Sequence, residues 1–433
     1  MRSGAVISLV LALPAAARAN PDSIVPSADP PAANVPTNFV ATIDYEYEAD
    51  RAQLEREQVG AGVPADGPIP LHRDLAFKQN RHTVTPRVDI GIIHDVWIYG
   101  ALPIVITQSR ELSLDSGVTA ADSSTIQSGF IPAGGYDAND ASTPPGGGVA
   151  FRGVDRHGLD QVDAGFGVAL MNQMRDDTKP TWKLGAEARI AIGRVMRFDP
   201  TRPTANTAVG EGAHELRVWT SFDRRLGWAE PWMDLFWQVP LAYTSASLYK
   251  DPGFGATNTG KGQVAGAHFG FEAYAVDTPD HNRISLDLGA RLIGHFEGRD
   301  YSELWELLAG AGNPSLGGPL VLDSDPLTAG TQAMAYPGIS NVENYLETGA
   351  RAAVRAQLGP HVRFAVTGDV TWLSEHVITF ADAGVDKNTN SLIDPGTNEV
   401  NPLHVDGIDL VGHRYHSVHG MSYIVGVQGQ VLF

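Results

Sequence analysis

The chain has 433 residues, with 50 acidic and 31 basic side chains and no cysteine. The resulting formal charge of −19 argues against a nucleic-acid partner, because nucleic acids select basic surfaces. Without cysteine the chain has no disulfide, no thiolate metal site and no thiol nucleophile.

The N-terminus has the features of an export signal. A basic start is followed by the apolar run 5–17 and by a small-x-small site that ends at Ala19. Residues 1–19 are therefore interpreted as a cleaved signal peptide, and the Pro-rich residues 20–38 as a flexible lead-in. No later apolar run reaches the roughly 18–20 residues of a membrane-spanning helix, so the exported chain is either soluble or a membrane barrel.

From residue 39 onward, apolar and polar residues alternate in short segments. In the segment 39–50, Phe39, Ile43 and Tyr45 share one face and acidic residues take the other. A barrel in lipid needs an apolar outer face and a polar inner face, whereas a soluble sandwich would turn the same apolar face to its core. We expect twelve strands, at 39–50, 76–93, 96–112, 159–172, 181–193, 214–225, 231–247, 263–276, 282–297, 344–358, 361–379 and 418–433.

Short and long connections alternate without exception. The tight turns lie at 94–95, 176–177, 226–228, 277–280 and 359–360, and the long loops at 51–75, 113–158, 194–213, 248–262, 298–343 and 380–415. This asymmetry predicts one all-β domain over 39–433. It is an up-and-down antiparallel transmembrane β-barrel of about twelve strands, with short periplasmic turns and long external loops. Trp97, Trp182, Trp228 and Trp232 flank tight turns, which predicts an aromatic girdle at the periplasmic interface.

Two stretches resemble known families. The segment 418–433 alternates apolar residues with Gln, Gly and Ser and ends on Phe433, and it resembles the closing strand of Gram-negative outer-membrane barrels. That resemblance implies an outer-membrane location with membrane lipids around the barrel. The hairpin 87–106 is similar to a barrel family named for the meta-pathway of phenol degradation, whose members are presumed to be outer-membrane transporters.

Charged residues on the polar faces are the candidate pore lining. The arginines on three adjacent strands are expected to form a basic strip that faces Asp44, Glu46, Glu48 and Asp89 across the lumen. The alternative is that these charges pair and fill the interior. The predicted lining residues are Glu272, Asp287, Arg291, Glu347, Arg351, Arg355, Arg363, Asp369 and Glu375.

Two loops carry further candidate features. The segment 300–310 predicts a short amphipathic helix, which either constricts the mouth or caps the outer rim. Another loop spaces Asp386, Asn388, Asn390 and Asp394 like calcium ligands, resembling the repeats of extracellular calcium-binding modules. Ser391 and Thr397 depart from the calcium pattern, so a polar turn is the alternative. Likewise, His404, His413, His416 and His419 are either transition-metal ligands or solvated rim residues.

These features favour an outer-membrane channel or transporter that passes small solutes. One alternative is a non-conducting barrel whose acidic loops bind a surface partner. A second is a lipid-modifying barrel enzyme, which needs a serine and a histidine on one face. Because His416 and Ser417 are neighbours on a strand, they point to opposite faces, and we expect no catalytic activity. No resident cofactor is expected apart from calcium in the last loop.

Overall fold

The computed structural model describes residue 25 and residues 38–58, 69–140 and 142–433. The predicted signal peptide lies outside the described residues, as does all of the lead-in except Val25 and Asn38. No helix within the described residues is long and apolar enough to cross a membrane.

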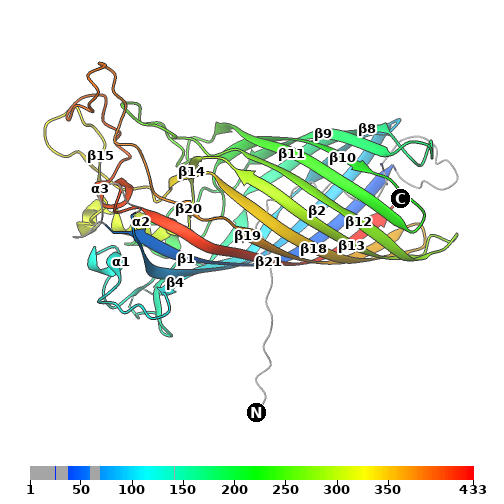
Figure 1. Ribbon diagram of the computed structural model, residues 1–433, viewed down its shortest axis with the longest axis horizontal. Helices are drawn as coiled ribbons and strands as arrows, with labels where there is room; N and C mark the ends of the chain where they lie inside the picture. Colours follow the sequence, from blue (N-terminus) through cyan, green and yellow to red (C-terminus); the bar gives the residue numbers. More distant parts are fainter. Residues whose placement is uncertain (1–24, 26–37, 59–68, 141) are drawn as a thin grey trace, which may run out of the picture.

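The chain forms a closed antiparallel β-barrel of twelve strands, as predicted (Figure 1). Each strand pairs with its neighbour in the chain, and β21 closes the barrel by pairing with β1 from Val40↔Leu432 to Arg56↔Tyr415. The wall consists of β1 (Phe39–Glu57), β2 (Leu71–Ile93), β3 (Val96–Ala101) continued by β4 (Ile104–Leu114), β7 (Arg156–Leu159) continued by β8 (Gln161–Met171), β9 (Thr181–Ala191), β10 (Ala213–Asp223), β11 (Ala229–Tyr243), β12 (Val264–Asp277), β13 (Arg283–His295), β18 (Tyr345–Leu358), β19 (Val362–Leu373) and β21 (Tyr415–Leu432).

Side chains along each strand alternate between an exposed apolar outer face and a buried inner face. On β13, Leu286 and Leu288 are exposed, whereas Asp287 between them is fully buried. This is the reverse of a soluble fold and fits a wall that faces lipid. The exposed apolar belt includes Ile43, Ile90, Ile98, Phe166, Ile190, Val218, Leu235, Trp237, Phe269, Leu288, Val354, Val366 and Val427.

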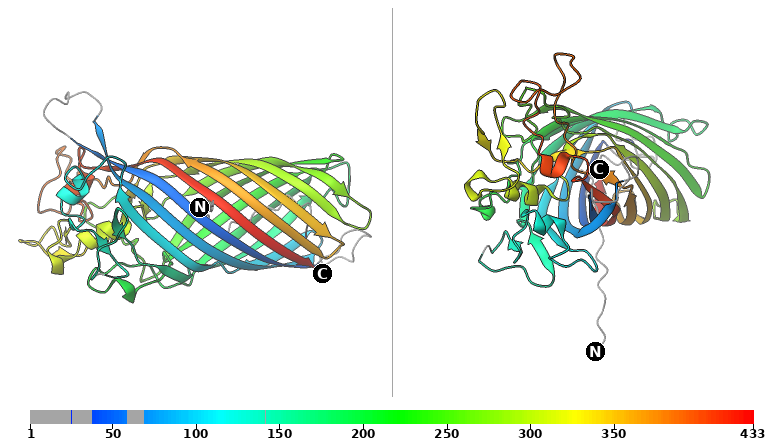
Figure 2. Two further views of the ribbon diagram at one scale, coloured as in Figure 1. Left: turned by 90° about the horizontal axis from the view of Figure 1, so that it is seen from below. Right: turned by 60° about the vertical axis from the view of Figure 1, so that its left-hand side comes forward.

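The two ends of the barrel differ, as the alternation of connections predicted (Figures 1 and 2). One end, called here the turn end, carries the five tight turns and Phe433. At the first of these turns His94 and Asp95 have positive φ values of 20° and 62°, a conformation that a tight hairpin demands. The other end, called here the loop end, carries the long connections.

The first loop is shorter than predicted. The β1–β2 ladder runs on to Glu57↔Leu71, so that the connection is 58–70 rather than 51–75. The charged stretch from Arg51 to Glu57 was predicted to be part of the loop, yet Ala52 and Leu54 on its inner face are buried. Burial of these side chains beneath the other loops keeps the strands paired beyond the apolar belt.

The loops at the loop end pack into a core of their own. They contain α1 (Ser124–Gln127), α2 (Trp305–Ala311), α3 (Asp406–Asp409), 3-10 turns at Pro203–Ala205 and Pro314–Leu316, and the short strands β5 (Tyr136–Asp137), β6 (Val149–Arg152), β14 (Gly298–Asp300), β15 (Leu322–Asp323), β16 (Ala333–Met334), β17 (Ser340–Val342) and β20 (His376–Val377). Their apolar side chains meet the inner faces of β1, β2 and β4 in a single buried cluster.

Candidate functional site

A buried ion-pair network links three neighbouring strands on the inner wall. Arg355 on β18 lies 2.8 Å from Glu272 on β12 and 2.9 Å from Asp287 on β13. Asp287 also accepts a hydrogen bond of 2.8 Å from the Trp232 indole. Glu272 and Asp287 are almost completely buried, so one guanidinium compensates two carboxylates that face the interior.

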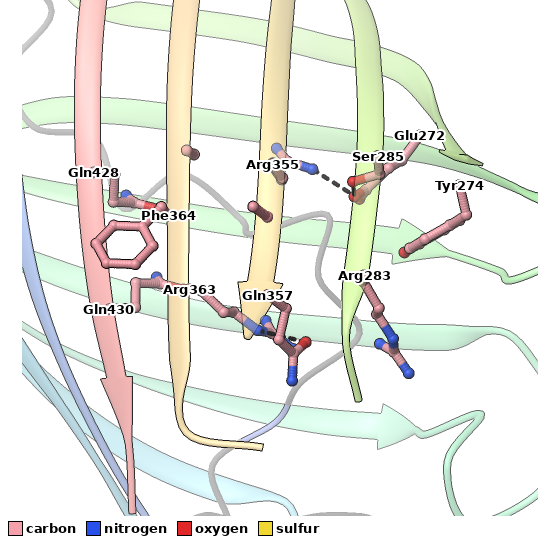
Figure 3. Close-up of a pocket in the computed structure, with 12 residues that line it drawn as sticks. Glu272, Tyr274, Arg283, Ser285, Arg355, Gln357, Arg363, Phe364, Gln428 and Gln430 are labelled. Carbon is pink, nitrogen blue, oxygen red and sulfur yellow. Dashed lines mark hydrogen bonds and ion pairs between the residues drawn. The ribbon is translucent and has the colours of Figure 1, made fainter. Parts of the chain in front are cut away.

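This network borders a small cavity at the turn end (Figure 3). Arg363 donates a hydrogen bond of 3.0 Å to Gln357, and the amides of Gln428 and Gln430 from β21 complete the lining. The cavity measures about 30 Å³, which is room for about two water molecules. This part of the inner wall at the turn end therefore presents mainly polar side chains.

The remaining predicted lining residues also face inward, with one exception. Arg291 pairs with Glu347 at 3.0 Å, and Arg351 lies opposite Asp369 in the β18–β19 register. Glu375 differs, because the ladder is interrupted between β19 and β20. Its side chain is 56% exposed and lies 3.4 Å from His416.

Two arginines of the predicted basic strip pair along the wall, which favours the alternative that the charges pair and fill the interior. Arg291 and Arg355 pair with carboxylates on the next strand or on the strand beyond it, as described above. In the β1–β2 hairpin, Asp89 pairs with Arg87 at 2.6 Å, and Arg81 lies 3.9 Å from Glu48. Opposite charges thus compensate each other locally in these pairs.

Aromatic side chains line the other half of the interior, where sequence reasoning had not placed them. Trp97 and Tyr99 on β3, Trp219 on β10 and Phe236 on β11 point inward and are buried. Trp232 is buried inside as well, so the predicted girdle is wrong for Trp97 and Trp232. The signal was present in the sequence, since Trp232 shares its parity with Asp234 and Gln238 rather than with the apolar residues of β11.

These rings lie flat against glycines of neighbouring strands. A β-carbon at Gly167 would lie 2.2 Å from the Trp97 ring, and one at Gly185 would lie 2.6 Å from the Trp219 ring. Each ring thus occupies the place that a side chain on the next strand would fill. The arrangement keeps bulky rings on the wall and gives the lumen an apolar surface.

Helix α2 lies within the buried core at the loop end. Leu304, Trp305, Leu307 and Leu308 are at most 1% exposed, which places the helix inside the core rather than on an exposed rim. A helix forms as predicted, but it is not amphipathic, because Glu306 is buried as well. The helix is shorter than predicted and begins at Trp305.

Polar contacts tie α2 and the residues before it to the barrel wall. Glu306 pairs with the fully buried Arg156 of β7 at 2.6 Å. Arg110 on β4 donates a hydrogen bond of 2.9 Å to the carbonyl of Ser302, and Ser417 on β21 donates one of 2.7 Å to Glu303. The segment is thus held from strands on both sides of the β1–β2 hairpin.

The predicted calcium ligands form a hydrogen-bonded loop. Asp386 accepts hydrogen bonds from the backbone of Asn388, Thr389 and Ser391. The side-chain amides of Asn388 and Asn390 both donate to one Asp394 oxygen, at 2.7 Å and 3.0 Å. Calcium binding here stays a prediction.

The four histidines have separate surroundings. His404 lies 3.0 Å from Asp406, and His416 lies 3.2 Å from Glu57. Throughout the described part of the chain, no three His, Asp or Glu side chains are grouped so as to hold a metal ion.

No protein-family model and no curated protein matches the sequence. The resemblance of 87–106 to the phenol-degradation barrel family therefore stays an expectation. Solved structures with a similar outline include an outer-membrane channel from Pseudomonas putida F1, at 8% identity and a TM-score of 0.38, covering 94% of this chain and 99% of that one. A Pseudomonas aeruginosa FadL homologue has 8% sequence identity and a TM-score of 0.34, and the match covers 92% of this chain and 90% of that one.

The Escherichia coli outer-membrane protease OmpT gives 7% identity and a TM-score of 0.29, with 92% of this chain and 98% of that one covered. These likenesses are distant. The closed barrel described above rests on the strand pairing of this chain itself.

Proposed function

We propose that this chain is an outer-membrane channel or transporter for small solutes, and that its role is passage rather than catalysis. One observation carries the proposal: a closed barrel turns an apolar belt outward and places charged and aromatic side chains inside. Such a wall is stable in a lipid bilayer and presents a chemically varied interior to solutes.

In this proposal, helix α2 is the gate at the loop end. Its apolar side chains pack into the loop-end core, and the Arg156–Glu306 pair anchors it to the wall. Solute entry then requires α2 to leave the loop-end core, because a packed apolar core leaves no path. The conformation described here is the closed one.

The test is permeability of the refolded barrel in lipid vesicles and planar bilayers. In the double variant Leu307→Asp with Leu308→Asp, two charges in the buried core should expel α2 without altering a barrel strand. We expect this variant to pass small solutes several-fold faster than the wild type. Leu316→Asp is the control, because Leu316 is exposed on the same loop and its substitution should leave the rate unchanged.

The packed loop end also favours a second candidate, a non-conducting barrel whose loops bind a surface partner. The same experiment separates the two candidates. Barrels that migrate as folded on unheated gels, yet pass no solute in either the wild type or the α2 variant, would contradict the channel proposal and favour the surface-binding one.

A further inference from the structure

One buried arginine in the lumen forms no ion pair with the described residues. Arg217 on β10 is 4% exposed, and its guanidinium lies 4.0 Å from the centre of the Phe236 ring. Within the described part of the chain Arg217 forms no ion pair, and its Nε has no hydrogen-bond partner. The carboxylate opposite it in the β9–β10 register, Glu187, is already paired with Arg189 at 3.2 Å.

Burying the Nε–H group of Arg217 without an acceptor is costly, because this group has lost water without gaining a hydrogen bond. Other arginines of the inner wall, such as Arg189 and Arg355, are compensated by ion pairs. Arg217 has no such ion pair within the described residues. An anion that enters the lumen would supply the missing acceptor.

An aromatic platform lies beside Arg217. Phe236, Trp219, Trp97 and Tyr99 form one cluster, in which the Trp219 indole donates a hydrogen bond of 3.2 Å to the Tyr99 hydroxyl. Val25 is packed against this cluster and is only 1% exposed. The platform therefore already accommodates a branched aliphatic group.

We propose that Arg217 and this aromatic cluster form a solute-binding site for a small amphiphilic monocarboxylate, at the place where Val25 now packs. The carboxylate pairs with Arg217, and the apolar or aromatic body lies on the rings, displacing Val25. The inference rests on the proposed transport function and names its solute class.

The surrounding charges favour a single negative charge on the solute. Glu187 and Asp234 face Arg217 from the neighbouring strands. A second carboxylate on the solute would meet these acids without a further free cation, and like charges in a buried site repel strongly. Dicarboxylates and phosphate esters are therefore expected to bind more weakly than monocarboxylates.

The test measures binding of benzoate and of its neutral analogue benzamide to the refolded full-length mature chain, through quenching of tryptophan fluorescence. Wild-type protein should bind benzoate at least about tenfold more tightly than benzamide, the size expected for a hydrogen bond to a charged group. The substitution Arg217→Gln should abolish this preference, because it should weaken the binding of benzoate and leave the binding of benzamide unchanged.

Arg283→Gln is the matched control, because it removes another interior-facing arginine at the turn end and should leave the benzoate preference intact. Equal wild-type affinity for the two probes would overturn the inference, even if Arg217→Gln failed to fold. So would unchanged benzoate binding in folded Arg217→Gln, or an equal loss in Arg283→Gln. A barrel that passes solutes but does not bind benzoate would contradict this inference and leave the transport proposal intact. A barrel that binds benzoate but passes no solute would contradict the transport proposal.

Discussion

At the scale of single residues, this barrel stabilises charges inside its wall by pairing them between neighbouring strands. Arg355 is the clearest case, since one guanidinium bridges Glu272 and Asp287. Removing one member of such a network leaves its partners buried and uncompensated, which costs far more than the net value of the pair.

Replacing Arg355 by methionine should therefore lower the free energy of unfolding by roughly 3–5 kcal/mol. The measurement is a urea titration of the barrel in lipid vesicles, followed by tryptophan fluorescence. Lys179→Met is the control, because Lys179 pairs with Asp176 on the surface of a turn and its loss should leave the midpoint unchanged. A midpoint for Arg355→Met equal to that of the wild type would show that the network contributes nothing.

At the scale of elements, the loop end is a second folded layer built on the barrel. Asp409 in α3 is part of it, and its two carboxylate oxygens accept hydrogen bonds from the backbone of Ala381 and Val405, at 2.9 Å and 2.8 Å. Burial raises the pKa of Asp409 to about 6, against an ordinary value of 3.8.

Because the folded loop holds this proton more tightly than the unfolded chain does, Asp409 makes the loop less stable as pH rises through 6. We expect backbone amides of residues 405–412 to exchange hydrogen more slowly at pH 5 than at pH 7.5, after correction for intrinsic exchange. Asp409→Asn should abolish this difference, whereas Asp251→Asn in another loop should preserve it. Equal protection of the wild type at both pH values would refute the assignment.

At the scale of the whole molecule, the polarity of the fold is inverted. Leucine, isoleucine, valine and phenylalanine form the exposed belt, while arginines and carboxylates fill the inside. The chain is therefore stable only where its surroundings are apolar at the height of the belt.

Leu288→Arg, in the middle of β13, should cost about 2–4 kcal/mol of stability in a bilayer, the penalty for a cation on a lipid-facing strand. The same change at Leu392, an exposed leucine in the last loop, should have little effect. Unfolding titrations in vesicles measure both variants. Similar stability for the two would contradict the assignment of the belt to the lipid phase.

Much of this fold could be predicted because its signals are local. Alternation of apolar and polar residues with period two predicts the strands. The short break in this alternation at His94 and Asp95 predicts a tight turn, and both residues have positive φ values there. The twelve strands, their order and the two unlike ends follow from these short-range patterns. Glu375 was misplaced because a break in a ladder leaves no mark in the alternation.

The sequence by itself thus determined the barrel, the inward parity of the charged residues and the apolar character of α2. Only the tertiary structure decided which charges pair, that Trp97 and Trp219 lie on glycines of other strands, and that Arg217 forms no ion pair with the described residues. The physical reason is that pairing and stacking depend on the stagger between strands, which brings together residues such as Glu272 and Arg355 from distant parts of the chain.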